Sequence, residues 1–149
     1  MKILMVCLGN ICRSPLAHGI LAHMIRENGL DWTVESAGTG DWHVGQAPDR
    51  RSVNVAKKYG VDISTQRARH FAQAFFDQYD YIFVMDDKNY SDVRALARDE
   101  ADLEKVKMFL LEGIVPDPYF DETQFEPVYQ LIADRCQVLI DELKKEGHS

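Results

Sequence analysis

Residues 2–15 of the chain read Lys2-Ile3-Leu4-Met5-Val6-Cys7-Leu8-Gly9-Asn10-Ile11-Cys12-Arg13-Ser14-Pro15. Residues 2–6 are nearly all apolar, which is typical of a central strand buried on both faces. Pro15 suits the first turn of a helix, where its missing N–H costs nothing, and Ser14 just before it can cap that helix or donate its hydroxyl. The sequence therefore predicts a strand, a loop and a helix, with the loop at the carboxyl edge of a sheet, where open α/β folds bind ligands.

The same alternation of strand and helix continues along the chain. Short apolar runs typical of strands occupy residues 3–6, 32–34, 81–85 and 106–110. Apolar residues at helical spacing occupy residues 16–25, 53–56 and 125–143. Gly29 and Gly60 are typical stops for the first two helices, and we expect the charged run 99–104 to be a loop. This order favours βαβ units and a parallel sheet, hence an α/β fold.

Composition limits the function classes. The chain has 149 residues, of which 46% are hydrophobic and 28% charged, with a net charge of −7. This length predicts one domain over residues 1–149. The negative charge predicts no binding to nucleic acid or membrane. We expect a soluble cytoplasmic protein, because no run reaches the roughly 18 to 20 apolar residues that span a bilayer. The three cysteines, Cys7, Cys12 and Cys136, are an odd number at uneven spacing, which favours free thiols. Cys136 lies on the apolar side of its helix and is expected in the core.

The loop after the first strand is predicted to bind an oxyanion. Gly9 and Asn10 readily accept a positive φ, so the loop can curl until its backbone N–H groups point inward. No Gly-Lys-Ser/Thr closes the loop, which excludes a Walker A motif. Arg13 stands in place of the lysine and offers a planar fork that holds two phosphate oxygens.

Cys7 lies at the base of the same loop. Inward N–H groups, a helix N-terminus, Arg13 and the Ser14 hydroxyl all favour a thiolate, which can take a phosphoryl group from a phosphate ester without a metal or cofactor. A lone cysteine is more often a small buried hydrophobe, but the Cys-x5-Arg-Ser spacing between strand and helix favours catalysis. A zinc site of Cys7, Cys12, His18 and His23 is disfavoured, because side chains five residues apart on a helix point in different directions.

Asp117 is the candidate general acid. Loss of an alkoxide or phenoxide needs a proton, and Asp117 follows the last predicted strand, so it lies at the same edge of the sheet as Cys7. Pro116 and Pro118 stiffen its segment, and Tyr119 can wall the entrance. An exposed turn is the alternative for any Asp-Pro pair.

These motifs resemble the low-molecular-weight protein-tyrosine phosphatase family along nearly the whole chain. The loop from Cys7 to Ser14 reads as that family's Cys-Leu-Gly-Asn-Ile-Cys-Arg-Ser, and Asp117-Pro118-Tyr119 reads as its late Asp-Pro-Tyr. Further positions that match the family are Ser36-Ala37-Gly38-Thr39, Trp42, Gly45, Arg67-Ala68-Arg69 and Met85-Asp86. The acid follows the nucleophile in this family and precedes it in larger tyrosine phosphatases.

The resemblance implies a three-layer fold, with a four-stranded parallel sheet and helices on both faces, and a phosphoric monoester hydrolase. It implies that Cys7 is the nucleophile, Arg13 binds phosphate, and Asp117 is the acid and then the base. Residues implied to form or support the phosphate loop are Leu8, Gly9, Asn10, Ile11, Cys12, Ser14 and Ser36. Those implied to form an apolar slot for a phosphotyrosine ring are Leu8, Ile11, Trp42 and Tyr119. The implied partner is a tyrosine-phosphorylated protein, with the enzyme a monomer or weak dimer.

Two positions add detail to the resemblance. Many relatives carry a histidine, in the network around the loop asparagine, where this chain has Gln66; we expect changed supporting contacts without loss of activity. Cys12 resembles the family's second loop cysteine, which forms a disulfide with the oxidised nucleophile and protects it. The alternative for Cys12 is a small packing residue.

Other functions remain open on the sequence. An arsenate reductase shares this fold and loop but needs further cysteines, and none lies between Cys12 and Cys136. Phosphoarginine phosphatases tend to have threonine in place of Ile11, so Ile11 and Tyr119 favour an aryl phosphate. A module that binds phosphate without catalysis would be marked by loss of Cys7 or Asp117, and both are present.

Overall fold

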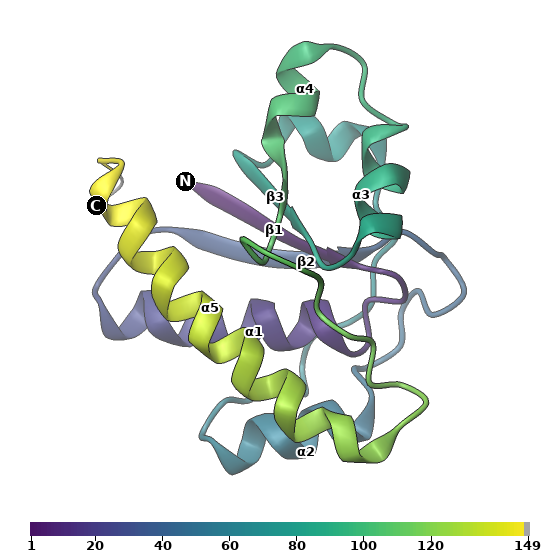
Figure 1. The fold of residues 1–149 in the computed structure, drawn as a ribbon, viewed down its shortest axis with the longest axis vertical. Helices are drawn as coiled ribbons and strands as arrows, with labels where there is room; N and C mark the ends of the chain where they lie inside the picture. The colour runs from purple at the N-terminus through teal and green to yellow at the C-terminus, as the bar shows by residue number, and fades with distance from the viewer. Residues whose placement is uncertain (148–149) are drawn as a thin grey trace.

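A parallel sheet of four strands lies at the centre of the protein, in a computed structural model that describes residues 1–147 (Figure 1). The strands are β1 (Lys2–Cys7), β2 (Thr33–Gly38), β3 (Tyr81–Val84) and β4 (Val106–Met108), in the order β2-β1-β3-β4. Every neighbouring pair is parallel. The predicted α/β fold and the predicted strand that opens the chain are therefore confirmed, and all carboxyl ends of the strands meet at one edge.

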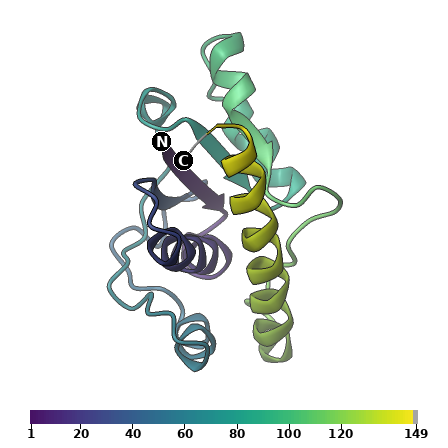
Figure 2. The same ribbon diagram turned by 90° about the vertical axis from the view of Figure 1, so that its left-hand side faces the viewer.

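Helices cover both faces of the sheet (Figures 1 and 2). On one face lie α1 (Arg13–Glu27), α2 (Arg50–Lys58) and α5 (Phe125–Lys145). On the other side are the 3-10 helix η1 (Gln73–Asp77), α3 (Asp87–Arg94) and α4 (Glu100–Lys105), and a short 3-10 helix η2 (Glu122–Gln124) precedes α5. Side chains of β1 alternate between two hydrophobic clusters: Met5 belongs to the cluster under α1 and α5, and Leu4 to the one that contains Val93 of α3. This alternation makes the fold three-layered, as expected.

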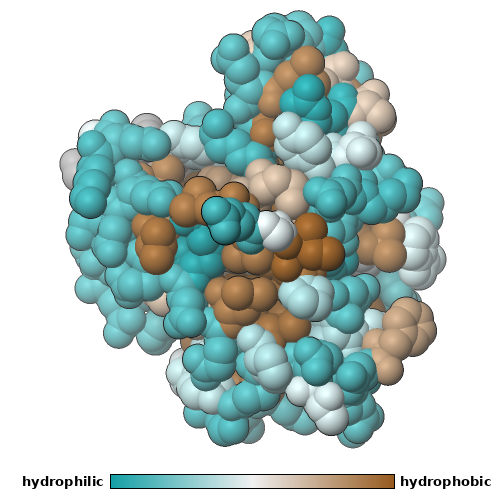
Figure 3. Space-filling view, in the orientation of Figure 1, coloured by the Kyte–Doolittle hydropathy of each residue, from teal (hydrophilic) through white to brown (hydrophobic). Residues whose placement is uncertain are grey.

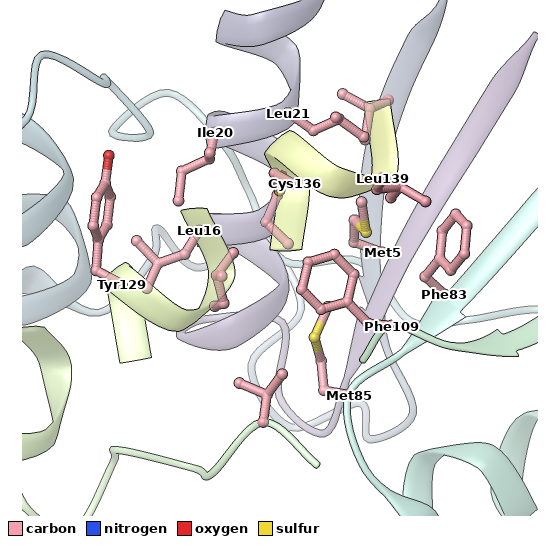
Figure 4. Packing of buried hydrophobic residues seen from close by; sticks show 14 of the residues in the cluster. Met5, Leu16, Ile20, Leu21, Phe83, Met85, Phe109, Tyr129, Cys136 and Leu139 are labelled. Carbon is pink, nitrogen blue, oxygen red and sulfur yellow. The ribbon is translucent and has the colours of Figure 1, made fainter. Parts of the chain in front are cut away.

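The larger cluster joins α1 and α5 to the sheet. Figure 4 shows Leu16 and Ile20 of α1 beside Cys136 and Leu139 of α5, with Met5 of β1 beneath them. Cys136 is fully buried there, which confirms its expected place in the core. Because the first turn of α1 also carries the end of the phosphate loop, this cluster fixes the loop against the sheet.

The sequence prediction was wrong at the charged run 99–104. These residues form the N-cap and first turns of α4, because the Asp99 carboxylate accepts a hydrogen bond of 2.9 Å from the Asp102 N–H. Asp102 in turn is buried and bonded to Arg98 at 2.8 Å. Charge alone suggested a loop, whereas the capping contact and the ion pair stabilise a short helix.

The segment between β4 and η2, residues 109–121, contains no helix or strand. It exposes large apolar side chains, among them Leu111 at 74% and Phe120 at 92%. Figure 3 shows apolar surface in the middle of this face of the molecule. Within residues 1–147, no helix is both long and apolar enough to cross a membrane. The same segment carries Asp117.

The helix α1 approaches the chain after α2 so closely that Gly19 has no room for a side chain. A Cβ there would lie 2.3 Å from Cγ2 of Ile63 and 3.2 Å from Cγ1 of Val61. Glycine to alanine normally stabilises a helix interior by about 1 kcal/mol. We predict instead that Gly19→Ala lowers the free energy of unfolding in urea by about 1 to 3 kcal/mol, through overpacking.

The control is the Gly19→Ala and Ile63→Ala double variant. Ile63→Ala removes the group that the new methyl would meet, so the double variant should lose less stability than the sum of the single variants. Strict additivity, or a Gly19→Ala protein as stable as wild type, would contradict this close approach.

Candidate active site

The loop after β1 curls around Asn10. This is the one non-glycine residue with a positive φ, 57°, among residues 1–147. The predicted positive φ is therefore confirmed for Asn10 but wrong for Gly9, where the constraint is space: a Cβ would lie 3.0 Å from Cδ2 of His43. The Asn10 side chain donates to Ser14 Oγ at 2.8 Å and accepts from the Arg69 backbone N–H at 2.9 Å. These two bonds hold the left-handed turn of the loop.

Cys7 ends β1 at the base of this loop and is 2% exposed. Its sulfur lies 3.0 Å from Ser14 Oγ and accepts the Ser14 backbone N–H at 3.4 Å. Because Asn10 already donates to Ser14 Oγ, the single hydroxyl hydrogen is free to point at the sulfur. Of the two roles predicted for Ser14, the structure has the hydroxyl contact and not the cap, since α1 begins at Arg13 and Cys12 takes the N-cap position. The sulfur thus lies within hydrogen-bonding reach of both the Ser14 hydroxyl and the Ser14 backbone N–H.

Arg13 is 3% exposed and lies beside the sulfur. Its Nη1 donates to Oδ2 of Asp86 at 2.7 Å and to the carbonyl of Val115 at 2.9 Å. Although burial acts against the charge, the Cys7, Asp86 and Asp117 groups raise the pKa of Arg13 above its usual value. With Nη1 engaged, the Nε and Nη2 edge of the guanidinium is left for two oxygens of a bound phosphate.

Asp86 is a functional residue to which the sequence analysis assigned no role. It lies two residues after the end of β3, at the same edge of the sheet as Cys7, and its other oxygen caps α3 by accepting the Asn89 N–H at 2.8 Å. Its position just after a predicted central strand could have marked Asp86 as a candidate site residue. Asp86 thus fixes the orientation of Arg13 from a helix start.

Asp117 faces the loop from the opposite side. Its Oδ2 is 3.8 Å from Nη2 of Arg13, its side chain is 38% exposed, and its Oδ1 accepts the Tyr119 N–H at 3.1 Å. The structure therefore brings Cys7, Arg13 and Asp117 together, although they are far apart in the sequence. A carboxyl group here can reach the outer side of a phosphate held in the loop.

All three line one cavity of about 310 Å³. Its lining residues are Cys7, Leu8, Gly9, Ile11, Cys12, Arg13, Trp42, His43, Asp117, Tyr119 and Phe120. The four residues expected to form an apolar slot all belong to this lining. His43 and Phe120 were not assigned to it from the sequence, although each directly follows a slot aromatic, Trp42 or Tyr119. Apolar and aromatic walls around a charged base suit a phosphate attached to an aromatic ring.

Ser36 and Gln66 lie outside this cavity and act on it through other residues. Ser36 Oγ is 3.0 Å from Nδ1 of His18, and the Ser36 carbonyl accepts Nε and Nη2 of Arg69 at 3.2 and 3.1 Å. Gln66 donates to the Pro15 carbonyl at 3.1 Å. The partner of Asn10 on this side is the Arg69 N–H, so Gln66 supports the start of α1 rather than the loop asparagine.

Cys12 is the second thiol of the cavity. Burial, with the nearby Asp49, Cys7 and Asp117 groups, raises the pKa of Cys12 far above its usual value. Its thiol therefore stays protonated beside Cys7. No three His, Cys, Asp or Glu residues gather as a metal site in the described part of the chain.

Comparison with known proteins shows the family of this chain. A family model described as "Low molecular weight phosphotyrosine protein phosphatase" matches residues 2–149. The chain belongs to this family. Its members are phosphatases, so the protein is a phosphoric monoester hydrolase.

Three relatives show how far the likeness extends. A putative low molecular weight protein-tyrosine-phosphatase of Synechocystis is 42% identical, covering 98% of each chain. The crystal structure of a protein tyrosine phosphatase from Entamoeba histolytica has a TM-score of 0.92 at 34% identity, covering 99% of each chain. Vibrio vulnificus Wzb, solved in complex with benzylphosphonate, has a TM-score of 0.86 at 32% identity, covering 95% of this chain and 98% of that one. The likeness thus covers both the phosphate loop and the Asp117 segment.

In this phosphatase His18 is predicted to set part of the acid sensitivity of the fold. Burial lowers the pKa of His18 from 6.5 to about 4, with the charge of Arg69 acting in the same direction and Glu35 against it. Above pH 6.5 neither state is protonated at His18; between pH 6.5 and 4 the unfolded state takes up the proton first, so stability falls as pH falls. The loss from this group is up to about 3 kcal/mol.

The measurement is urea unfolding of wild type and His18→Gln between about pH 7 and pH 4. Glutamine keeps a donor for Ser36 but does not titrate, so the wild-type free energy of unfolding should fall more steeply than that of the variant. Parallel pH profiles for the two proteins would contradict the low pKa of His18.

Proposed function

We propose that this protein hydrolyses phosphotyrosine in protein substrates, and small aryl phosphates, through a phosphocysteine intermediate. The observation that carries the proposal is the single cavity that holds Cys7, Arg13 and Asp117 under aromatic walls. Each part has a role that general chemistry requires: a nucleophile, a cation for the transferred group and a proton source.

Binding uses the loop and the start of α1. Backbone N–H groups of the loop and the positive end of the helix favour a dianion above the Cys7 sulfur. The free edge of Arg13 then binds two phosphoryl oxygens, and the walls formed by Trp42 and Tyr119 contact the ring. The benzylphosphonate bound by the Vibrio vulnificus relative has the same two parts, an aromatic group and a phosphorus oxyanion.

Transfer begins with attack of the Cys7 thiolate on phosphorus. A sulfur–phosphorus bond forms, the bond from phosphorus to the phenolic oxygen breaks, and the protonated Asp117 carboxyl gives its proton to that oxygen. Arg13 stabilises the equatorial oxygens of the flattened phosphoryl group. The products are a phenol and phosphocysteine.

Hydrolysis reverses the proton transfer. The Asp117 carboxylate accepts a proton from a water molecule as the water oxygen attacks phosphorus, and the sulfur–phosphorus bond breaks. Inorganic phosphate leaves, and the Cys7 thiolate is restored with Ser14 as its hydrogen-bond donor. No metal or cofactor enters either step.

Two alternative activities of the same fold have weaker support. An arsenate reductase passes a disulfide along several cysteines, but Cys136 is fully buried on α5, where its sulfur faces the Ala17 carbonyl of α1. A phosphoarginine phosphatase is disfavoured by the apolar lining at Ile11 and Tyr119. Turnover of phosphotyrosine, phosphoarginine and arsenate measured side by side would separate the three.

The first test of the proposed function is hydrolysis of p-nitrophenyl phosphate in excess EDTA by wild type and Cys7→Ser. Wild type should keep its full rate under chelation, because no step needs a metal. Cys7→Ser should lose at least about 10⁴-fold in kcat, because the nucleophile is gone. A chelation-sensitive rate, or an active Cys7→Ser protein, would contradict the proposed chemistry.

Cys12 is proposed to protect Cys7 from oxidation. Peroxide oxidises Cys7 to a sulfenic acid; the Cys12 sulfur then attacks the Cys7 sulfur, the sulfur–oxygen bond breaks, and the hydroxyl leaves with the Cys12 proton as water, so that a disulfide is formed. We predict a Cys7–Cys12 linkage in peptide mass spectra after mild peroxide, and recovery of activity with dithiothreitol. Cys12→Ser should instead be inactivated irreversibly; equal recovery in both proteins would contradict the role. This cycle requires a reducing compartment, which supports a cytoplasmic location.

A further inference from the structure

Arg51 is fixed to the phosphate loop from the side of α2. Its Nε and Nη2 donate to Oδ1 and Oδ2 of Asp49 at 3.0 and 2.9 Å, a bidentate pair. Asp49 is the N-cap of α2, and its own N–H donates to the Ile11 carbonyl at 2.7 Å. The guanidinium is therefore held at a set position relative to the phosphate loop.

Arg51 also contacts the segment that carries Asp117 and the start of α5. Its guanidinium carbon lies 5.4 Å from the ring centroid of Tyr119 and 4.5 Å from that of Phe125. Both distances are within the range of a cation–π contact, about 6 Å. Tyr119 in turn donates its N–H to Asp117. A continuous path of contacts thus runs from Ile11 through Asp49, Arg51 and Tyr119 to the carboxyl group.

The Asp117 segment has a firm anchor on one side of Asp117 only. Before it, Val115 is fully buried, and its N–H donates to the Met85 carbonyl at 2.8 Å. After it, Tyr119 is 39% exposed, and residues 109–121 contain no helix or strand. The contact with Arg51 supports this second side. The Arg13 to Asp117 distance of 3.8 Å is too long for a hydrogen bond. A displacement of the acid by about 1 Å is enough to lower a rate by about 100-fold.

We propose that Arg51 is a positioning residue for Asp117: held by Asp49, it supports the Tyr119 ring and so sets the distance between the Asp117 carboxyl and the leaving oxygen. The inference rests on the proposed function, in which Asp117 is the general acid. It assigns to α2 a part in the reaction that does not involve contact with the substrate.

The dependence of the rate on the leaving group separates positioning from a purely structural role. Phenolate is a poor leaving group and needs the proton of the acid, whereas dinitrophenolate leaves without one. The value of kcat/KM reports steps up to the release of this group, so it is not affected by the later hydrolysis of phosphocysteine. A misplaced acid therefore lowers kcat/KM for phenyl phosphate and leaves kcat/KM for dinitrophenyl phosphate nearly unchanged.

The experiment measures kcat/KM for both esters with wild type, Arg51→Met, Asp49→Asn and Asp117→Asn. For Arg51→Met we expect a fall of at least about tenfold with phenyl phosphate and less than about threefold with dinitrophenyl phosphate. Asp49→Asn keeps a good N-cap but removes the carboxylate that holds Arg51, so it should show the same pattern as Arg51→Met, a larger loss with phenyl phosphate than with dinitrophenyl phosphate. In the Arg51→Met and Asp49→Asn double variant, the loss in kcat/KM for phenyl phosphate should be smaller than the product of the two single losses, because both substitutions act through one contact.

Arg50→Met is the matched control. Arg50 is exposed, lies next to Arg51 on α2, and is expected to leave both rates unchanged. Thermal unfolding of each variant checks folding, and Asp49→Asn carries the test if Arg51→Met does not fold.

The results distinguish a failure of the Arg51 role from a failure of the Asp117 role. Equal losses with both esters, or no loss, in the Arg51 and Asp49 variants would overturn the positioning role while Asp117→Asn still discriminates between the esters. If Asp117→Asn itself fails to discriminate, the acid assignment is wrong, and the role of Arg51 is overturned together with it.

Discussion

The active site depends on Asn10, whose side chain holds the phosphate loop from both sides. Its amide donates to Ser14 and its carbonyl oxygen accepts from Arg69, so the loop keeps a left-handed turn that other residues adopt at a cost. That turn aims the loop at the Cys7 sulfur and leaves the Ser14 hydroxyl free to donate to it. The proposed anion site is therefore shaped by the protein's own contacts, so that stabilisation of charge there would need little rearrangement during the reaction.

The parallel sheet explains why distant residues meet. Carboxyl ends of β1, β3 and β4 lie along one edge, and each is followed by one part of the site: the Cys7 loop, Asp86 and the Asp117 segment. Asp86 orients Arg13, while the Val115 carbonyl adds a second contact from the segment after β4. Arg13 is thus the point at which all three segments join.

The sequence predicted the features that local chemistry controls. The buried strand, the loop with its Cys-x5-Arg-Ser spacing, the glycine stops and the Pro-flanked Asp117 all depend on near neighbours, and they were found. Gly9 and the run 99–104 were interpreted wrongly because their roles depend on which distant group lies nearby: Gly9 faces His43, and Asp102 of α4 pairs with Arg98. Of the two roles predicted for Ser14, the hydroxyl contact is present, with the Cys7 sulfur as its partner, and the helix cap is not. Asp86 and Arg51 acquire their contacts only once the chain has folded.

The proposed mechanism requires Cys7 to carry the phosphoryl group during turnover. Rapid acid quench of the enzyme during hydrolysis of phenyl phosphate, followed by peptide mass spectrometry, tests this requirement. We expect one added phosphate on the peptide that contains Cys7, and none on that peptide from Cys7→Ser. Phosphate on another side chain, or continued turnover without any covalent phosphate, would contradict it.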